Sequence, residues 1–207
     1  MWNYLSSLFK RSHRGPRPPL ETQLVGPRVI LRTGDPMDWH GWRALRDISR
    51  DYLVPWEPAW PPNALTYNYF CALLRKHWRD WKKGTGYAFL IFKRSDDGQP
   101  GALLGSITLS DVQRSIAQKG TLGYWVGKLY AGQGYMTEAA GLVCNFAFDT
   151  LKLHRIEAAC LPHNEPSKSL LKHLGFEQEG YAKAYLKING FWEDHILWGK
   201  TAPPRPH

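Results

Sequence analysis

A glycine-bearing loop between a short apolar segment and a helical pattern has the residue types and spacing that could bind a ligand. Residues 123–126 (GYWV) are typical of a strand, residues 131–134 (AGQG) of a tight turn, and Tyr135 begins a helical pattern. Glycine lets the backbone approach a ligand closely, because it has no Cβ. The first turn of a helix has unpaired N–H groups at the positive end of its dipole. This order therefore predicts a cradle for a phosphate or pyrophosphate.

Two familiar phosphate-binding loops do not fit this segment. A P-loop needs Lys and then Ser or Thr after its second glycine, whereas Tyr135 and Met136 follow Gly134. A dinucleotide fingerprint needs a third glycine where Thr137 stands. A lone G-x-G at such a junction is equally consistent with a plain turn. The functional interpretation therefore depends on the rest of the C-terminal half.

That half continues in a characteristic order. A helical pattern runs to about Leu151, a β-type run covers residues 154–161 (HRIEAACL), and Asn164 precedes residues 165–176 (EPSKSLLKHLGF) and 179–183 (EGYAK). The series resembles the GCN5-related N-acetyltransferase (GNAT) superfamily, and most closely its RimJ-like branch of ribosomal-protein-alanine N-acetyltransferases. The resemblance spans about residues 28–201 and is specific from Gly123 onward.

The resemblance implies that acetyl-CoA lies in a V-shaped gap between two parallel central strands. Its pyrophosphate would rest on the loop 129–134 and the helix start, and its pantetheine arm would pair with the strand 123–127. No metal is implied. The residues expected at the cofactor are Tyr124, Trp125, Val126, Gly127, Gly132, Gln133, Gly134, Tyr135, Met136, Thr137, Asn164 and Ser167.

Two departures from the superfamily pattern bear on the chemistry. The loop usually begins with Gln or Arg, where this chain has Lys128 or Leu129. The superfamily often places a tyrosine, as the general acid, at the position of Leu171. The RimJ-like branch often has leucine there too, and the general acid is therefore left unnamed.

Acetyl transfer to an amine needs a proton acceptor, a donor that polarises the thioester carbonyl, and attack geometry. The predicted catalytic residues are Asn164, Glu157 and Ser169. Asn164 could cap the following helix and still face the cofactor. Glu157 lies on the strand expected to line the gap, with a surface salt bridge as its alternative role. Ser167 or Ser169 could donate to the thiolate through water, or could be solvated helix residues.

Other candidate residues have structural alternatives of their own. His163 could be a base or an exposed loop histidine, and Glu138 a base or a carboxylate that favours the helix dipole. Trp56 and Trp60 could line a peptide groove or anchor their loop. Cys160 is expected to pack in its strand, because this transfer needs no covalent intermediate.

Local patterns predict the order β-α-α-β-β-β-α-β-α-β-β, an α+β fold with a mixed sheet of about seven strands and helices on both faces. Asp35 is expected to cap the first helix, and residues 53–62 have too many prolines for a helix. A final hairpin turning at residues 188–190 either lines the acceptor side, as in related enzymes, or packs on the core. Residues 1–22 form a basic, proline-rich leader, residues 23–201 the acetyltransferase domain and residues 202–207 a short tail.

Composition restricts the partners. The formal charge of +9 and the pI near 9.5 favour RNA, a ribosomal surface or cofactor phosphates, although a generally basic protein is the simpler alternative. The leader could make weak contacts with RNA, the ribosome or a membrane surface, but a flexible leader without such contacts is the favoured interpretation. Three cysteines without C-x-x-C spacing suit a reducing compartment, so a cytoplasmic location is predicted. No apolar run approaches the ~20 residues of a membrane span.

The favoured function is acetyl-CoA-dependent acetylation of a protein's N-terminal α-amine, with a ribosomal protein as the first candidate acceptor. An α-amine titrates near ~7.7–8.0, which lessens the need for a strong base. The first alternative is acetylation of a small amine such as a polyamine or aminoglycoside, which a basic chain disfavours. The second is a non-catalytic ribosome- or RNA-binding factor on the same fold. The oligomeric state stays open.

Overall fold

The β-strands of residues 22–204, the part of the chain that the computed structural model describes, form one eight-stranded sheet with the order β1-β2-β3-β4-β5-β6-β8-β7. Neighbouring strands are antiparallel except β5 and β6, which are parallel. The strands are β1 Gln23–Val25, β2 Val29–Arg32, β3 Tyr87–Arg94, β4 Pro100–Gln113, β5 Lys119–Val126, β6 Arg155–Cys160, β7 Glu177–Ile188 and β8 Phe191–Thr201. This is the predicted mixed fold, with β1 as a strand that the sequence prediction missed.

The helices lie between these strands as the predicted order requires. They are η1 Pro36–Asp38, α1 Trp39–Ile48, α2 Arg50–Leu53, η2 Val54–Trp56, α3 Tyr67–Lys83, η3 Lys128–Tyr130, α4 Tyr135–Asn145, the π-helical η4 Phe146–Thr150 and α5 Glu165–His173.

The structure confirms the predicted cap of the first helix and corrects the prediction for the proline-rich segment. The Asp35 carboxylate accepts from Met37 N at 3.0 Å, and Asp35 N donates to the Asp38 carboxylate at 2.7 Å, which completes a capping box. The proline-rich segment 53–62 was expected to contain no helix, and this was wrong for its beginning. Pro55 lies in the first turn of η2, where a missing N–H does no harm.

Helices cover both faces of the sheet, and β3 shows how the sequence separates them. Phe89 and Ile91 belong to a core cluster with buried residues of α4, whereas Leu90 and Phe92 cluster with buried residues of α1 and α3. Successive side chains of a strand point to opposite faces, so this single apolar strand contributes to both cores.

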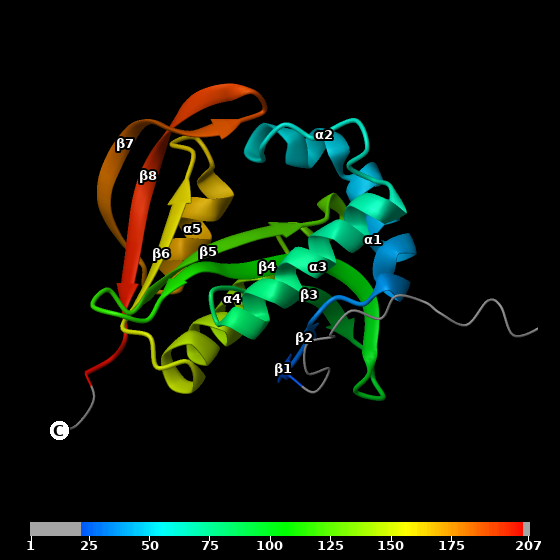
Figure 1. Cartoon of the computed structure of the whole chain (residues 1–207), viewed down its shortest axis with the longest axis horizontal. Helices are drawn as coiled ribbons and strands as arrows, with labels where there is room; N and C mark the ends of the chain where they lie inside the picture. The colour runs from blue at the N-terminus through cyan, green and yellow to red at the C-terminus, as the bar shows by residue number, and fades with distance from the viewer. Residues whose placement is uncertain (1–21, 205–207) are drawn as a thin grey trace, which may run out of the picture.

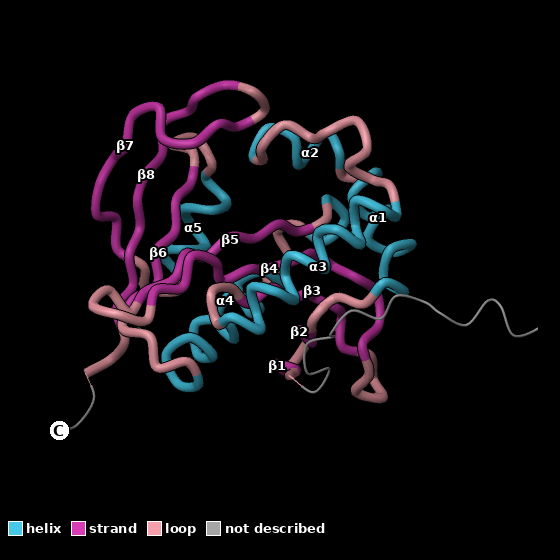
Figure 2. The backbone as a smooth tube through the Cα atoms, viewed as in Figure 1, coloured by secondary structure: helices cyan, strands magenta, loops and turns pink. Residues whose placement is uncertain are grey.

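The parallel strands β5 and β6 separate along their length, which opens the predicted V-shaped gap. They pair only where residues 119–121 face residues 155–157, and β5 then continues to Val126 without a partner on that side in the described sheet. Figure 1 shows β6, β8 and β7 turning away from β5. The tip of the β7–β8 hairpin reaches toward the α2–η2 segment (Figure 2), where Asn189 N donates to Glu57 O at 2.9 Å.

Some predictions fall outside the described residues. Residues 1–21 of the expected leader and residues 205–207 of the tail are not described, so the proposed RNA contact is untested. None of the helices within residues 22–204 is both long and apolar enough to span a membrane.

Candidate active site

A cavity of about 1030 Å³ lies where β5 and β6 separate, and it extends past the starts of α4 and α5. This volume is at the upper end of the range for ligand sites, ~300–1,000 Å³. The predicted site residues that line it are Tyr124, Trp125, Val126, Gly132, Gly134, Met136, Thr137, Asn164, Ser167 and Ser169.

The glycine loop has the backbone conformation that the sequence suggested. Gly132 and Gly134 have φ angles of 71° and 80°, in the left-handed region that favours glycine. A Cβ on Gly132 would meet no described atom within 4 Å, and one on Gly134 would meet Arg28 Nη2 at 3.1 Å. The loop therefore presents backbone to open space at Gly132, close to the N-terminus of α4, which is a fitting cradle for a pyrophosphate.

Glu138, in the first turn of α4, fixes this loop to β2. Its carboxylate accepts from Arg28 N at 2.8 Å, from Val29 N at 3.1 Å and from Arg28 Nε at 3.0 Å. Arg28 also donates to Gln133 O at 3.0 Å. With this carboxylate already accepting three hydrogen bonds, Glu138 has the structural role that its position in the helix suggested.

Two hydroxyl groups meet across the gap. Tyr124 Oη and Ser167 Oγ lie 2.7 Å apart, and Asn164 Oδ1 accepts from Ser167 N at 3.1 Å. Asn164 therefore caps α5 as predicted and still lines the cavity. Burial raises the pKa of Tyr124 to about 12, although its hydrogen bond with Ser167 opposes the shift. The phenol is thus neutral near pH 7 and able to donate a hydrogen bond.

Three residues predicted at the cofactor do not line either cavity described in residues 22–204. A Cβ on Gly127 would lie 2.3 Å from Leu45 Cδ1, so this glycine permits close packing of α1. The Gln133 side chain donates to the backbone of its own loop at 2.8 Å. The Tyr135 ring lies 4.9 Å from the Arg28 guanidinium. Their cofactor contacts stay predictions.

Glu157 also lies outside the described cavities. Its carboxylate pairs with Lys119 Nζ at 2.7 Å and with Arg155 Nε at 3.0 Å. Burial raises the pKa of Glu157, but these hydrogen bonds outweigh that effect and hold the pKa below its usual value. A catalytic role for Glu157 stays a prediction that this position does not favour. Leu171, at the expected tyrosine position, is fully buried.

The structure adds one carboxylate that sequence reasoning did not single out. Glu57 follows η2 and lines the cavity together with Trp56, Tyr52 and Leu53. The signal in the sequence was a single acidic residue within a segment rich in proline and tryptophan.

Comparisons with known proteins agree with this fold. The family model of the acetyltransferase (GNAT) domain matches residues 28–177. The probable N-acetyltransferase YjcK of Bacillus subtilis strain 168 is 45% identical over 172 residues, which cover 83% of this chain and 93% of that protein. The ribosomal protein uS5-alanine N-acetyltransferase of Escherichia coli K12 is 34% identical over 186 residues, which cover 88% and 92%.

A solved structure shows the same relationship. Mycobacterium smegmatis RimJ, in complex with CoA-disulfide, matches with a TM-score of 0.80 and 30% identity over 90% of each chain. The chain belongs to the GNAT acetyltransferase family. Within that family it is an N-acetyltransferase of the RimJ-like type.

Proposed function

We propose that this chain transfers the acetyl group of acetyl-CoA to the N-terminal α-amine of a protein, with a ribosomal protein as acceptor. The observation that carries the proposal is the glycine loop at the start of α4, which opens into a cavity containing a partly buried hydroxyl pair. The Escherichia coli relative acts on an alanine of ribosomal protein uS5, which supports this acceptor class.

The residues present suit each part of acetyl-CoA. The backbone of residues 132–134 and the first-turn N–H groups of α4 would hold the pyrophosphate. The edge of β5 beyond Thr121 that faces β6 has no strand partner within residues 22–204, and it would pair with the amides of the pantetheine arm. Bound acetyl-CoA supplies an activated acetyl group.

The hydroxyl pair is the first candidate for protonating the leaving sulfur. When Tyr124 donates to Ser167, the Ser167 proton is free for an atom in the cavity. Ser167 would then be the proton donor, a role for which the sequence left both Ser167 and Ser169 as candidates. Ser167 would take the place of the tyrosine that the superfamily often has at the position of Leu171.

The electrostatics of the site favour an α-amine over a small polycation. Among residues 22–204, the carboxylates lining the cavities are Glu57 and Glu138, and each pairs with an arginine. A polyamine or aminoglycoside would meet no group of free carboxylates there. An α-amine is partly neutral at pH 7, because its pKa is near ~7.7–8.0.

The first test is ligand binding. Acetyl-CoA should raise the melting temperature, whereas NAD should not, because a ligand of the folded state alone stabilises it. Peptides beginning with Ala or Ser are then incubated with the protein and acetyl-CoA, and their masses are measured by mass spectrometry. The same peptides with an N-acetylated first residue serve as controls. No shift with acetyl-CoA, or no added acetyl group on any peptide or ribosomal protein, would contradict the proposal.

A further inference from the structure

A second cavity, of about 380 Å³, lies beside the first. Its walls include side chains of α1, α3, β3 and the proline-rich loop, and it shares Glu57, Tyr124 and Trp125 with the first cavity. Glu57 therefore stands where a ligand of one cavity would meet a ligand of the other.

The carboxylate of Glu57 is held in one orientation by three donors. Arg46 donates to Oε1 at 3.1 Å and to Oε2 at 2.5 Å, and Trp60 Nε1 donates to Oε2 at 2.8 Å. A carboxylate has about four acceptor sites, so one is left for a ligand. The Glu57 side chain is 19% exposed, which leaves it within reach of the cavities.

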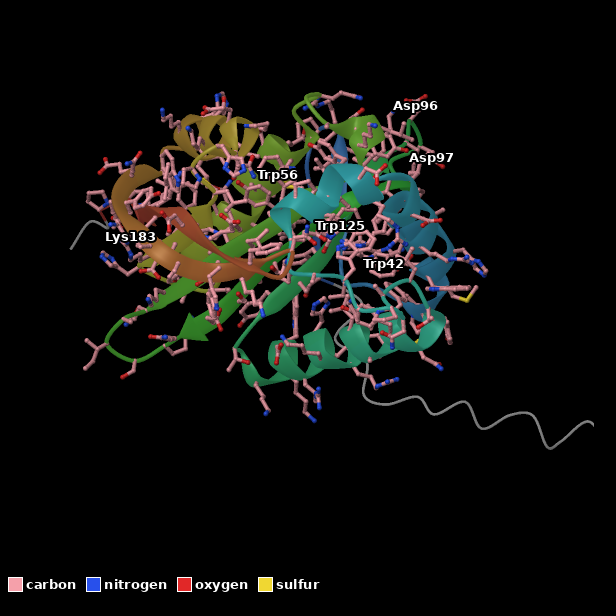
Figure 3. All side chains as sticks on the ribbon, turned by 90° about the horizontal axis from the view of Figure 1, so that it is seen from above. Trp42, Trp56, Asp96, Asp97, Trp125 and Lys183 are labelled. Atoms are coloured by element: carbon pink, nitrogen blue, oxygen red, sulfur yellow. The ribbon has the colours of Figure 1, made fainter. Side chains whose placement is uncertain are left out.

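Arg46 is itself fixed by aromatic rings. Its guanidinium carbon lies 4.2 Å from the Trp60 ring centroid, 4.8 Å from that of Trp125 and 5.6 Å from that of Trp42. Figure 3 shows Trp42 and Trp125 next to each other, and the rings of both lie beside Arg46. Cation–π contacts and low exposure make Arg46 a rigid support for Glu57.

The other walls of the second cavity are mostly apolar. They include Phe70, Leu74 and Leu90, and the charged residues among them are paired to each other as Arg46 and Glu57. Burial lowers the pKa of His77, another wall residue, to about 4, so it is neutral at pH 7. An uncharged side chain beside an amine suits such walls.

We infer that Glu57 is a catalytic residue that binds the acceptor α-amine and accepts its proton, and that the second cavity takes the uncharged side chain of the acceptor's first residue. This inference rests on the proposed acetyl transfer. The amine nitrogen forms a bond to the acetyl carbon, and the bond from that carbon to sulfur breaks with its electron pair on sulfur. The nitrogen, now cationic, gives one proton to Glu57, and the sulfur receives one from Ser167. Both residues return to their starting states through solvent.

The main test compares Glu57→Gln with Asp38→Asn. Asp38 has a similar bidentate pair with Arg32 and lies outside both cavities described in residues 22–204. The probe is a hexapeptide beginning with Ala. For Glu57→Gln at pH 7, kcat/KM should fall about 100-fold or more, within the ~10²–10⁴-fold range of general acid–base catalysis. Affinity for acetyl-CoA should stay within about threefold of wild type, a change below ~1 kcal/mol. Asp38→Asn should keep its kcat/KM.

The pH profile separates catalysis from structure. Wild-type kcat/KM should level off once the amine is neutral, above its pKa of ~7.7–8.0. The rate of Glu57→Gln should continue to rise, because hydroxide then takes the proton, so the deficit shrinks toward pH 9.5. A deficit that is constant with pH, or equal in Asp38→Asn, would overturn the inference. If Glu57→Gln does not fold, Glu57→Asp is measured in the same way, since it keeps the charge but withdraws the carboxylate.

A binding measurement distinguishes failure of this inference from failure of the proposed function. Calorimetry on the enzyme with CoA compares the free hexapeptide with its N-acetylated twin. Wild type should prefer the free amine, and Glu57→Gln should lose that preference. If wild type shows the preference but acetylates no peptide, the proposed transfer is wrong and the amine site stands. If transfer occurs but Glu57→Gln matches wild type in rate and binding, only the inference is wrong.

Discussion

The hydroxyl groups of Tyr124 and Ser167 lie 2.7 Å apart and connect β5 to the first turn of α5 across the gap between β5 and β6. Each hydroxyl is positioned by its own element: Tyr124 extends from a strand, and Ser167 follows the Asn164 cap. The gap is therefore bridged at this point by a hydrogen bond, and both hydroxyl-bearing residues line the cavity of about 1030 Å³.

Ser167→Ala should lower kcat about 10- to 100-fold and leave acetyl-CoA affinity nearly unchanged, because it removes a proton donor rather than a binding wall. Ser169→Ala is the matched control, since Ser169 lines the same cavity two residues further along α5. Steady-state kinetics with a peptide beginning with Ala gives both values. A larger loss for Ser169→Ala would restore the role first predicted for Ser169.

Tyr124 should keep its proton throughout the working pH range. Burial raises the pKa of Tyr124 to about 12, so the phenol is protonated below that pH. The wild-type rate should therefore not decline between pH 8 and pH 10, and Tyr124→Phe should be slower at every pH in that range. A wild-type decline that disappears in Tyr124→Phe would contradict this assignment.

Gly134→Asp should weaken acetyl-CoA binding by about 100-fold or more, equal to ~2.7 kcal/mol, because it places a carboxylate in the pyrophosphate cradle. A non-glycine residue at positive φ also costs ~1–2 kcal/mol of stability. Gly98→Asp controls for that cost, because Gly98 has a φ of 76° in the turn between β3 and β4. Calorimetric titration should show normal binding in Gly98→Asp; equal losses in both variants would argue against the cradle.

The sequence correctly predicted those features that depend on residues close together in the chain. The glycine loop, the Asp35 and Asn164 caps and the final hairpin turn all depend on residues within a few positions of one another. Along β6 the alternation of a strand buries Ile156 and leaves Glu157 partly exposed on the other side. The three-residue β1 was missed because a strand that short shows no period.

Long-range pairing accounts for what the sequence did not reveal. Glu157 lies next to Lys119 only because the β5–β6 register sets Lys119 opposite Arg155 and Thr121 opposite Glu157. Glu57 reaches the site only because α1 supports it through Arg46 and the β7–β8 hairpin bonds to its carbonyl. No spacing within its own segment reports these contacts.

Glu157→Gln should reduce stability by up to about 1 kcal/mol, the range of a solvent-exposed ion pair, and leave kcat/KM nearly unchanged. The reason is that Glu157 pairs with Lys119 and Arg155 outside the described cavities. Urea unfolding and peptide kinetics measure the two effects separately. A large loss of kcat with normal stability would instead support the predicted catalytic role.

Acid should destabilise the fold partly through His77. Burial lowers the pKa of His77 in the folded protein to about 4, below its ordinary value of 6.5. Between these values the unfolded chain binds the proton and the folded chain does not. The contribution of His77 is complete above pH 6.5 and is lost as the pH falls to about 4, up to ~3 kcal/mol.

The test for His77 is urea unfolding at pH 7.5 and pH 4.5. The free energy of unfolding should fall less in His77→Gln than in wild type. His154→Gln, at an exposed histidine, should behave like wild type. If the free energy of unfolding depends on pH equally in wild type and His77→Gln, then His77 takes up no proton when the chain unfolds.

The exposed aromatic residues of the β7–β8 hairpin should matter for a folded acceptor but not for a short peptide. Phe191 and Trp192 are 70% and 65% exposed, and the hairpin tip bonds to the Glu57 segment at the cavity. A protein acceptor whose N-terminus enters the cavity would extend past this hairpin, whereas a hexapeptide would not. Trp192→Ala should therefore raise KM about tenfold, ~1.4 kcal/mol, for an intact ribosomal protein acceptor and leave KM for the hexapeptide unchanged. Met37→Ala, at an apolar residue outside the hairpin that is 85% exposed, is the control. Equal KM values for both substrates in Trp192→Ala and wild type would mean that the acceptor body docks on another surface.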